Sequence, residues 1–344
     1  MKDLPWRNPD YFGSTAEEEK RRFRRDISRS AWALLIMLVA ANLLAFLISF
    51  MLMSQGIMQA GTLADVSALT VEDLLASTGM SPAVYDFVVS YLPSILGEIL
   101  LIVLLRYWVG FRLKETSYVS SKTQKAGQMT ILAYFSGWGC AAVASIVIGL
   151  LLQLLSAMGW VMNLPEIASP LPGEDPLGFV LTMSYVCILG PILEEIIFRG
   201  FILNGTKKYG EAVGVVVSTL FFMMYHGNLA QTVTPLLVGL LFGFLTVRTG
   251  SILPAILCHM LHNTTAMALD YIPGDWYNMA FAVYAIVGIG ALLYFLYRFL
   301  PERKSLKTFG RTGRGERFLE FLLAPGFIVY FILYLLLSAL YFIL

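Results

Sequence analysis

The sequence predicts an all-α membrane protein, a polytopic transmembrane helix bundle of about nine spans with a cytoplasmic N-terminus. Three observations predict this fold class. The 344 residues are 58% hydrophobic and only 14% charged, whereas ordinary soluble domains are about 45–50% apolar and about 25% charged. The mean hydropathy is +0.72. Long apolar runs also recur along the chain, with short polar segments between them. This composition excludes a typical soluble enzyme and a disordered chain.

Nine apolar runs are candidate spans. They lie near 31–53, 88–109, 129–155, 177–198, 213–225, 233–247, 252–269, 279–299 and 321–344. The first run is longer than the apolar part of a signal peptide, so we expect a retained helix. The fifth and sixth runs are shorter than the ~20 residues of a straight span, but neighbouring helices in a bundle tolerate short spans. These two runs are alternatively a re-entrant pair, which leaves the other spans unchanged.

The distribution of basic residues supports this topology. With the N-terminus inside, all 24 Lys and Arg residues fall in segments on the cytoplasmic side. The outside segments near 54–87, 156–176, 227–232 and 270–278 carry no basic residues, and together they hold several acidic ones. Because cytoplasmic loops are enriched in Lys and Arg, this one-sided pattern favours nine spans with the C-terminus outside.

The chain divides by composition into four parts. Residues 1–29 form a basic cytoplasmic segment, and residues 30–300 form the main helical domain, with its polar motifs in 177–270. Residues 301–320 form a basic cytoplasmic linker, and residues 321–344 form a C-terminal transmembrane helix. The net charge of +1 gives no reason to expect a nucleic-acid partner. The three cysteines lie far apart in apolar runs and indicate no disulfide framework.

Ionisable residues within the spans cluster in three segments. An ionisable residue inside a membrane is costly and is a functional candidate by default. The fourth span ends with Glu194, Glu195 and Arg199. Glu195 and Arg199 are four residues apart on one helix face, so we expect them to pair. Glu194 points about 100° away and is free to face the bundle interior.

All three histidines of the chain lie in the other two segments. His226 ends the fifth span, one turn after Phe222, which is expected to pack against its ring. His259 and Asn263 are four residues apart in the seventh span and are expected to approach one point together. His262, three residues after His259, is the alternative second member of that pair.

This arrangement has three chemical interpretations. In the first, Glu194 and His226 deprotonate a water while His259 and Asn263 stabilise an oxyanion, which is general-base peptide hydrolysis. In the second, His226, His259 and Glu194 bind zinc, although the chain lacks the HExxH motif of the zincin helix. In the third, the cluster is a proton relay or substrate site of a transporter. If the residues have no catalytic, metal-binding or transport role, they are polar pairs that help the helices to pack.

Glu98 in the second span is a further buried acid. We interpret it as a packing or snorkelling carboxylate, with Arg106 two turns later as its expected partner.

The three segments resemble the CAAX protease and bacteriocin-processing family of intramembrane proteases. This family includes type II CAAX prenyl endopeptidases and lysostaphin-resistance-like bacterial members. Its pattern is EExxxR on one helix, FxxxH on a second and HxxxN on a third. The matching residues here are Glu194, Glu195 and Arg199, then Phe222 and His226, then His259 and Asn263. The resemblance covers about 177–270.

The resemblance implies an eight-helix protease core and an endopeptidase that cleaves a membrane-embedded protein or peptide. Glu194 and His226 would activate the water, His259 and Asn263 would form the oxyanion site, and Glu195 and Arg199 would be an orienting pair, with Phe222 in support. No cofactor is favoured, and zinc is the alternative. CAAX-type, bacteriocin or pheromone processing would each fit, in a bacterial plasma membrane. A non-catalytic scaffold, an immunity protein and a transporter remain alternatives.

Overall fold

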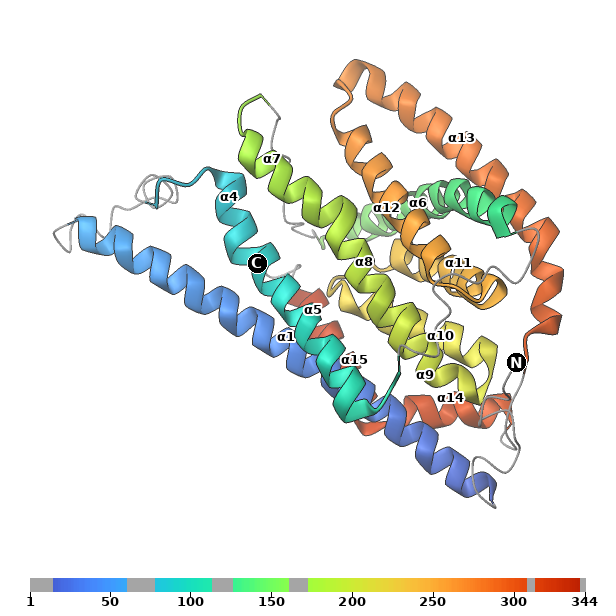
Figure 1. Ribbon diagram of the computed structural model, residues 1–344. Helices are drawn as coiled ribbons and strands as arrows, with labels where there is room; N and C mark the ends of the chain where they lie inside the picture. The colour runs from blue at the N-terminus through green and yellow to red at the C-terminus, as the bar shows by residue number, and fades with distance from the viewer. Residues whose placement is uncertain (1–14, 61–77, 113–125, 161–172, 308–312, 341–344) are drawn as a thin grey trace.

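The computed structural model describes residues 15–60, 78–112, 126–160, 173–307 and 313–340, and every regular element in these ranges is helical (Figure 1). The protein is thus an all-helical, multi-pass integral membrane protein. The helices of the N-terminal half are α1 (Ala16–Ala60), α4 (Pro82–Asp86), η3 (Phe87–Tyr91), α5 (Leu92–Leu104), η4 (Leu105–Val109) and α6 (Ala126–Ala157). The next helical stretch comprises α7 (Pro176–Met183), η6 (Ser184–Leu189), α8 (Gly190–Glu195), η7 (Ile196–Leu203), α9 (Asn204–Thr206) and η8 (Lys207–Tyr209). The remaining elements are α10 (Glu211–Tyr225), α11 (Val233–Thr249), α12 (Leu253–Asp270), α13 (Gly274–Phe299), η9 (Leu300–Ser305), α14 (Arg314–Leu322) and α15 (Pro325–Leu340).

Each of the nine predicted apolar runs contains a helix, but the helices differ in length. Five helices are long and apolar enough to cross a membrane, and the bent pair α14–α15 is a sixth candidate. The apolar helices α10 and α11 are shorter. They lie in the middle of the bundle in Figure 1 and bury much of their surface on neighbouring helices. The number of nine spans therefore stays a prediction.

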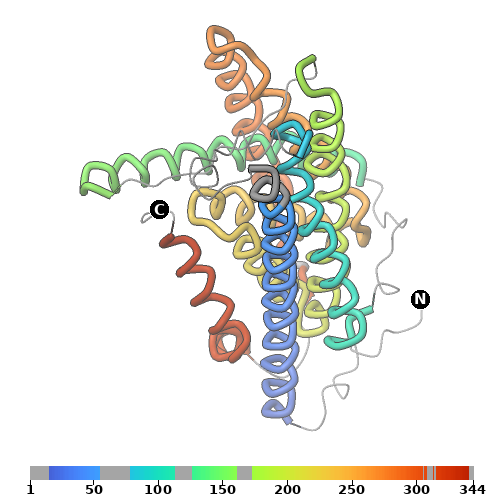
Figure 2. Tube along the Cα trace, turned by 90° about the vertical axis from the view of Figure 1, so that its left-hand side faces the viewer, coloured from blue at the N-terminus to red at the C-terminus, as the bar shows by residue number. Residues whose placement is uncertain are grey.

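The core has two parts. One cluster joins α1, α5, η7, α10 and α15, and the other joins α6, α11, α12 and α13. Figure 2 shows α6 running across the direction of α1. The crossing of α6 and α13 depends on two glycines, because a Cβ atom on Gly139 would lie 2.3 Å from the carbonyl oxygen of Gly288. Small residues at such a crossing let two membrane helices approach closely.

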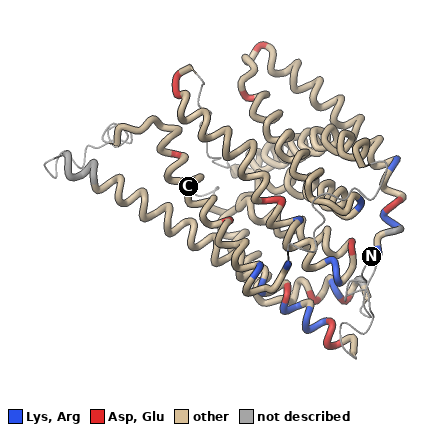
Figure 3. Tube along the Cα trace, in the orientation of Figure 1, with Lys and Arg blue, Asp and Glu red and all other residues tan. Residues whose placement is uncertain are grey.

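The basic residues gather at one end of the bundle, as the positive-inside pattern predicts. Figure 3 shows the described Lys and Arg residues gathered around the end where α1 begins and α13 ends, while the opposite helix ends carry acidic residues.

Both terminal regions differ from the prediction in their boundaries. The helix of the first span begins at Ala16, so half of the segment predicted as a polar N-terminal region belongs to α1. The stretch 301–320, predicted as a linker, contains η9 and most of α14. In the last apolar run, helix α15 begins at Pro325, after a bend of 65° that separates it from α14. A proline suits the first turn of a helix because its missing N–H has no partner there.

Candidate functional site

The two glutamates lie on a continuous helical stretch from Pro176 to Leu203. A π-helical turn, η6, directly precedes α8, and Pro191 lies in the first turn of α8. Proline inside a helix removes one backbone hydrogen bond and crowds the preceding turn, so a local widening accommodates it. Pro93 follows the π-helical turn η3 in the same way. Glu194 and Glu195 follow this proline within α8.

Glu195 is the centre of a buried ion pair. Its Oε1 accepts hydrogen bonds from Nη1 of Arg199 at 2.8 Å and from Nδ1 of His259 at 3.0 Å. The side chains of Glu195 and Arg199 are both 0% exposed. The pair predicted from the spacing of four residues is confirmed. The bond to His259 crosses between two helices and was not predicted.

Arg199 has several contacts besides Glu195. Its guanidinium lies over the ring of Phe222, 4.5 Å from the centroid, and 5.9 Å from that of Phe242. Its Nη2 also donates to the carbonyl oxygen of Gly239 at 3.4 Å. These contacts compensate the buried cation, because the aromatic face and the carbonyl both attract positive charge. The arginine thereby holds Glu195 in one orientation.

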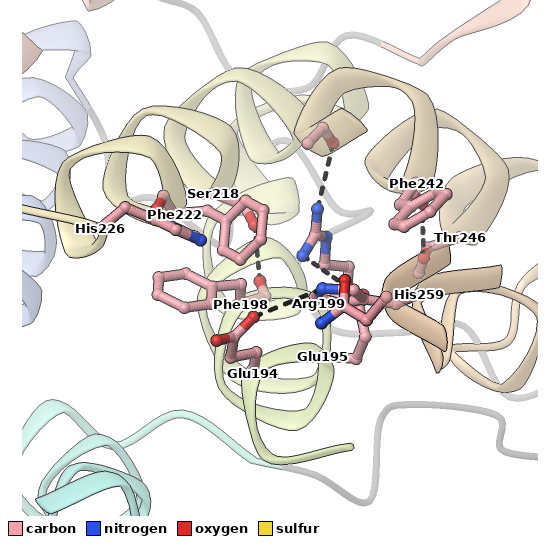
Figure 4. Close-up of polar contacts among 12 residues, drawn as sticks. Glu194, Glu195, Phe198, Arg199, Ser218, Phe222, His226, Phe242, Thr246 and His259 are labelled. Atoms are coloured by element: carbon pink, nitrogen blue, oxygen red, sulfur yellow. Dashed lines mark hydrogen bonds and ion pairs between the residues drawn. The ribbon is translucent and has the colours of Figure 1, made fainter. Parts of the chain in front are cut away.

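His259 lies between the two glutamates (Figure 4). Its Nδ1 faces Glu195, and its Nε2 lies 3.6 Å from Oε2 of Glu194. Since a carboxylate only accepts, Nδ1 carries the proton, and Glu195 thus determines the ring's tautomer and direction. The Glu194 side chain is 15% exposed, against 0% for Glu195. At 3.6 Å this contact is longer than a direct hydrogen bond.

His226 has a different partner. Its Nδ1 contacts the carbonyl oxygen of Phe222 at 2.9 Å, so this nitrogen donates and Nε2 keeps its lone pair. Its ring meets that of Phe222 edge-on at 4.9 Å, as predicted. Within the described residues no hydrogen bond or ion pair joins His226 to Glu194 or His259. Figure 4 shows His226 at the end of α10, apart from the group around Glu195.

The remaining polar residues of α12 point elsewhere. Asn263 donates from its side-chain amide to the carbonyl oxygen of Val186 at 2.9 Å, so one of its two amide hydrogens links α12 to η6. His262 is buried against α6, where a Cβ atom on Gly137 would lie 3.3 Å from its Nδ1. The expected approach of His259 and Asn263 to one point is therefore not a direct contact. His262 does not contact the glutamates.

Glu98 belongs to the surroundings of the site, which the sequence did not indicate. Its carboxylate is fully buried and accepts a hydrogen bond from the Tyr225 hydroxyl at 2.6 Å. Tyr185 also interacts with this carboxyl group. The expected pairing with Arg106 is wrong, because Arg106 is exposed and lies over the ring of Tyr107. Tyr225 directly precedes His226, and that adjacency was the one available signal.

The positions of these side chains also show whether they could bind a metal ion together. Among the residues that the structure describes, no three His, Cys, Asp or Glu side chains lie close enough together to hold a metal ion. The donor set suggested for zinc, His226, His259 and Glu194, is therefore not assembled. Both nitrogens of His259 instead face carboxylates.

Comparison with known proteins gives two relatives and one family. The family "Type II CAAX prenyl endopeptidase Rce1-like" matches residues 176–265. An "Uncharacterized 24.3 kDa protein" of Escherichia coli is 31% identical over 94 residues, which is 26% of this chain and 43% of that protein. The "Putative membrane peptidase YdiL" of Bacillus subtilis (strain 168) is 33% identical over 87 residues, which is 25% of this chain and 36% of that protein.

The chain spans less than half the length of each relative. No solved structure matches. The matched region contains all three motifs, so the resemblance seen in the sequence is confirmed. Over residues 176–265, the chain is similar to the type II CAAX prenyl endopeptidase Rce1-like family.

Proposed function

We propose that the protein is an intramembrane endopeptidase that hydrolyses a peptide bond in a membrane-associated protein or peptide. The observation that carries the proposal is the chain of contacts Arg199–Glu195–His259–Glu194, which is built at the family motifs. Buried ionisable groups inside a membrane bundle are costly, and they are retained where they serve a function. The relatives come from bacteria, which favours a bacterial plasma membrane.

In the proposed reaction, Glu194 is the general base. It is the more exposed of the two glutamates, and its Oε2 lies 3.6 Å from Nε2 of His259, so one water beside the pair could contact both atoms. The water oxygen attacks the carbonyl carbon of the substrate while its proton passes to Glu194. When the carbon–nitrogen bond breaks, the protonated Glu194 returns this proton to the leaving amine, so the carboxylate is regenerated.

His259 and Glu195 orient the attacking water. The hydrogen bond from Nδ1 of His259 to Glu195 directs Nε2 toward Glu194. Arg199 fixes Glu195 in turn. This order of contacts resembles a catalytic triad, in which a buried acid sets the tautomer of a histidine without taking its proton.

His226 and Asn263 keep the roles that the motifs suggest. His259 does not, because the tautomer with its proton on Nδ1 leaves none on Nε2 to donate to the oxyanion. The lone pair on Nε2 of His226 suits a second acceptor for the water's protons. Asn263 has a second amide hydrogen besides the one bonded to Val186, and this hydrogen suits the oxyanion. Substrate binding would have to bring both groups to the reacting bond.

The test uses Glu194→Gln, which preserves shape but removes the base. Membrane peptides from cells with the wild type and with the variant are compared by quantitative mass spectrometry. Glu174→Gln, an exposed residue of the loop before α7, is the matched control. We expect one or more precursors to accumulate only with Glu194→Gln. With the purified protein and that precursor, cleavage should slow by about 10²–10⁴-fold.

Normal processing by a stably inserted Glu194→Gln protein would contradict the proposal. It would favour a non-catalytic scaffold or immunity protein.

A further inference from the structure

The side chains along α1 indicate where the membrane surface lies. From Trp32 onward, the exposed side chains are apolar except for Asn42, and they include Trp32, Ile36, Val39 and Leu43. On the N-terminal side of Trp32, arginines alternate with the buried residues Phe23 and Ile27. Tryptophan is enriched at membrane–water interfaces. Arg29 therefore lies about 4.5 Å, and Arg21 about 16 Å, on the polar side of this level.

A pocket of about 270 Å³ lies at this level, between α1 and the start of α15. It is lined by Arg21, Arg24, Arg25, Ser28, Arg29 and Pro325. Arg21, Arg25 and Arg29 follow each other at intervals of four residues and share one helix face. Four arginines thus line one open pocket at the depth of the lipid headgroups.

Within the described residues, acidic side chains neutralise only part of this positive charge. Arg24 pairs with Glu320 at 2.6 Å. Arg25 lies 3.8 Å from Asp26, whose carboxylate is already bonded by Lys208 and Tyr209. For Arg21 and Arg29, the described part of the chain supplies no acidic partner.

The pocket is built by tertiary packing, not by a run of charges alone. The backbone N–H of Gly326 donates to Oγ of Ser28 at 2.9 Å. A Cβ atom on Gly326 would lie 2.3 Å from the carbonyl oxygen of Ser28, so α15 touches α1 here. Pro325 forms one wall. Residues almost 300 positions apart in sequence therefore shape the cavity.

We infer that this pocket binds the phosphate of an anionic phospholipid in the leaflet on the basic side of the bundle. Guanidinium groups match phosphate oxygens in geometry and charge. Basic pockets between helices at headgroup depth are typical lipid sites. Basic residues that only set the orientation of the chain in the membrane do not need to line a pocket. Here, three arginines on one helix face line the same pocket.

The test measures lipid binding to the purified full chain in a neutral detergent. Phosphatidylglycerol, phosphatidylcholine and inorganic phosphate are titrated separately, and bound molecules are counted by native mass spectrometry. The triple variant Arg21→Gln, Arg25→Gln, Arg29→Gln removes the pocket's unneutralised charge. The matched control, Arg303→Gln, Lys304→Gln, Lys307→Gln, removes three exposed charges from the same side of the bundle.

We expect the wild type and the control to bind phosphatidylglycerol alike, and the triple variant to bind it on the order of 100-fold more weakly. Phosphatidylcholine and inorganic phosphate should bind weakly to all three proteins. Equal binding of phosphatidylglycerol by the triple variant and the control would overturn the inference. Equal binding of phosphatidylglycerol and phosphatidylcholine by the wild type would also overturn the inference. This second outcome does not require any variant to fold. Saturation by inorganic phosphate alone would identify a free-phosphate site instead, and would also overturn it.

Discussion

Replacing Glu195 with leucine is expected to lower the free energy of unfolding by about 3–5 kcal/mol, because it leaves a buried charge without its counter-charge. Arg199 is 0% exposed, and its remaining polar partner would be the Gly239 carbonyl oxygen at 3.4 Å. The aromatic faces of Phe222 and Phe242 offset only part of this loss.

The double variant Glu195→Leu, Arg199→Met should be more stable than Glu195→Leu alone. It removes both charges, and an apolar replacement of a buried pair is often neutral. The Nδ1–H of His259 would still lose its acceptor, at a cost of about 1–3 kcal/mol. We therefore expect the order wild type, double variant, single variant, with about 2 kcal/mol between the last two.

Thermal unfolding of the purified variants in detergent measures this order. The single variant should melt on the order of 5–10 °C below the wild type. Arg298→Gln is the control, because its pair with Glu302 is 3.7 Å long and its side chain is 39% exposed. Such surface pairs contribute about 0–1 kcal/mol. A double variant that melts at or below the melting temperature of Glu195→Leu would refute the reasoning, since removing the second charge would then not stabilise the protein.

Two further predictions concern the surroundings of the site. His259→Gln should lower the rate of cleavage of an identified substrate by at least about 10²-fold, because the His259 ring contacts the glutamates. His262→Gln should change this rate by no more than a few fold, because the His262 ring does not contact them. Equal losses in the two variants would mean that both rings take part in the reaction. Tyr225→Phe removes the hydroxyl that donates to Glu98 and should destabilise the protein by about 1–3 kcal/mol in detergent melting. Tyr107→Phe, at a position that is 79% exposed, should not change the melting temperature, and an equal shift in both variants would contradict the buried bond.

Contacts within one helix were predictable from the sequence. Helical geometry alone places residues four apart on one face, so the pairs Glu195–Arg199 and Phe222–His226 followed from spacing. The helical class and the one-sided distribution of basic residues followed from composition and charge.

Contacts between helices were less predictable. The sequence placed His259 in the right segment but did not show that its ring would lie between two carboxylates. It assigned Glu98 to an arginine on its own helix, whereas the partner is Tyr225, more than 120 positions later in the chain. Which residues meet across helices depends on how each helix is rotated and how deeply it is inserted, and spacing along one helix carries no information on either.

The sequence by itself therefore determined which residue types lie inside the membrane and which of them share a helix face, because helical periodicity and the cost of burying charge act locally. Only the tertiary structure decided that Glu195 holds both Arg199 and His259, and that the start of α15 closes an arginine-lined pocket on α1. Both arrangements depend on close approaches between distant segments, such as Gly326 on Ser28, and these are set by the packing of the whole bundle.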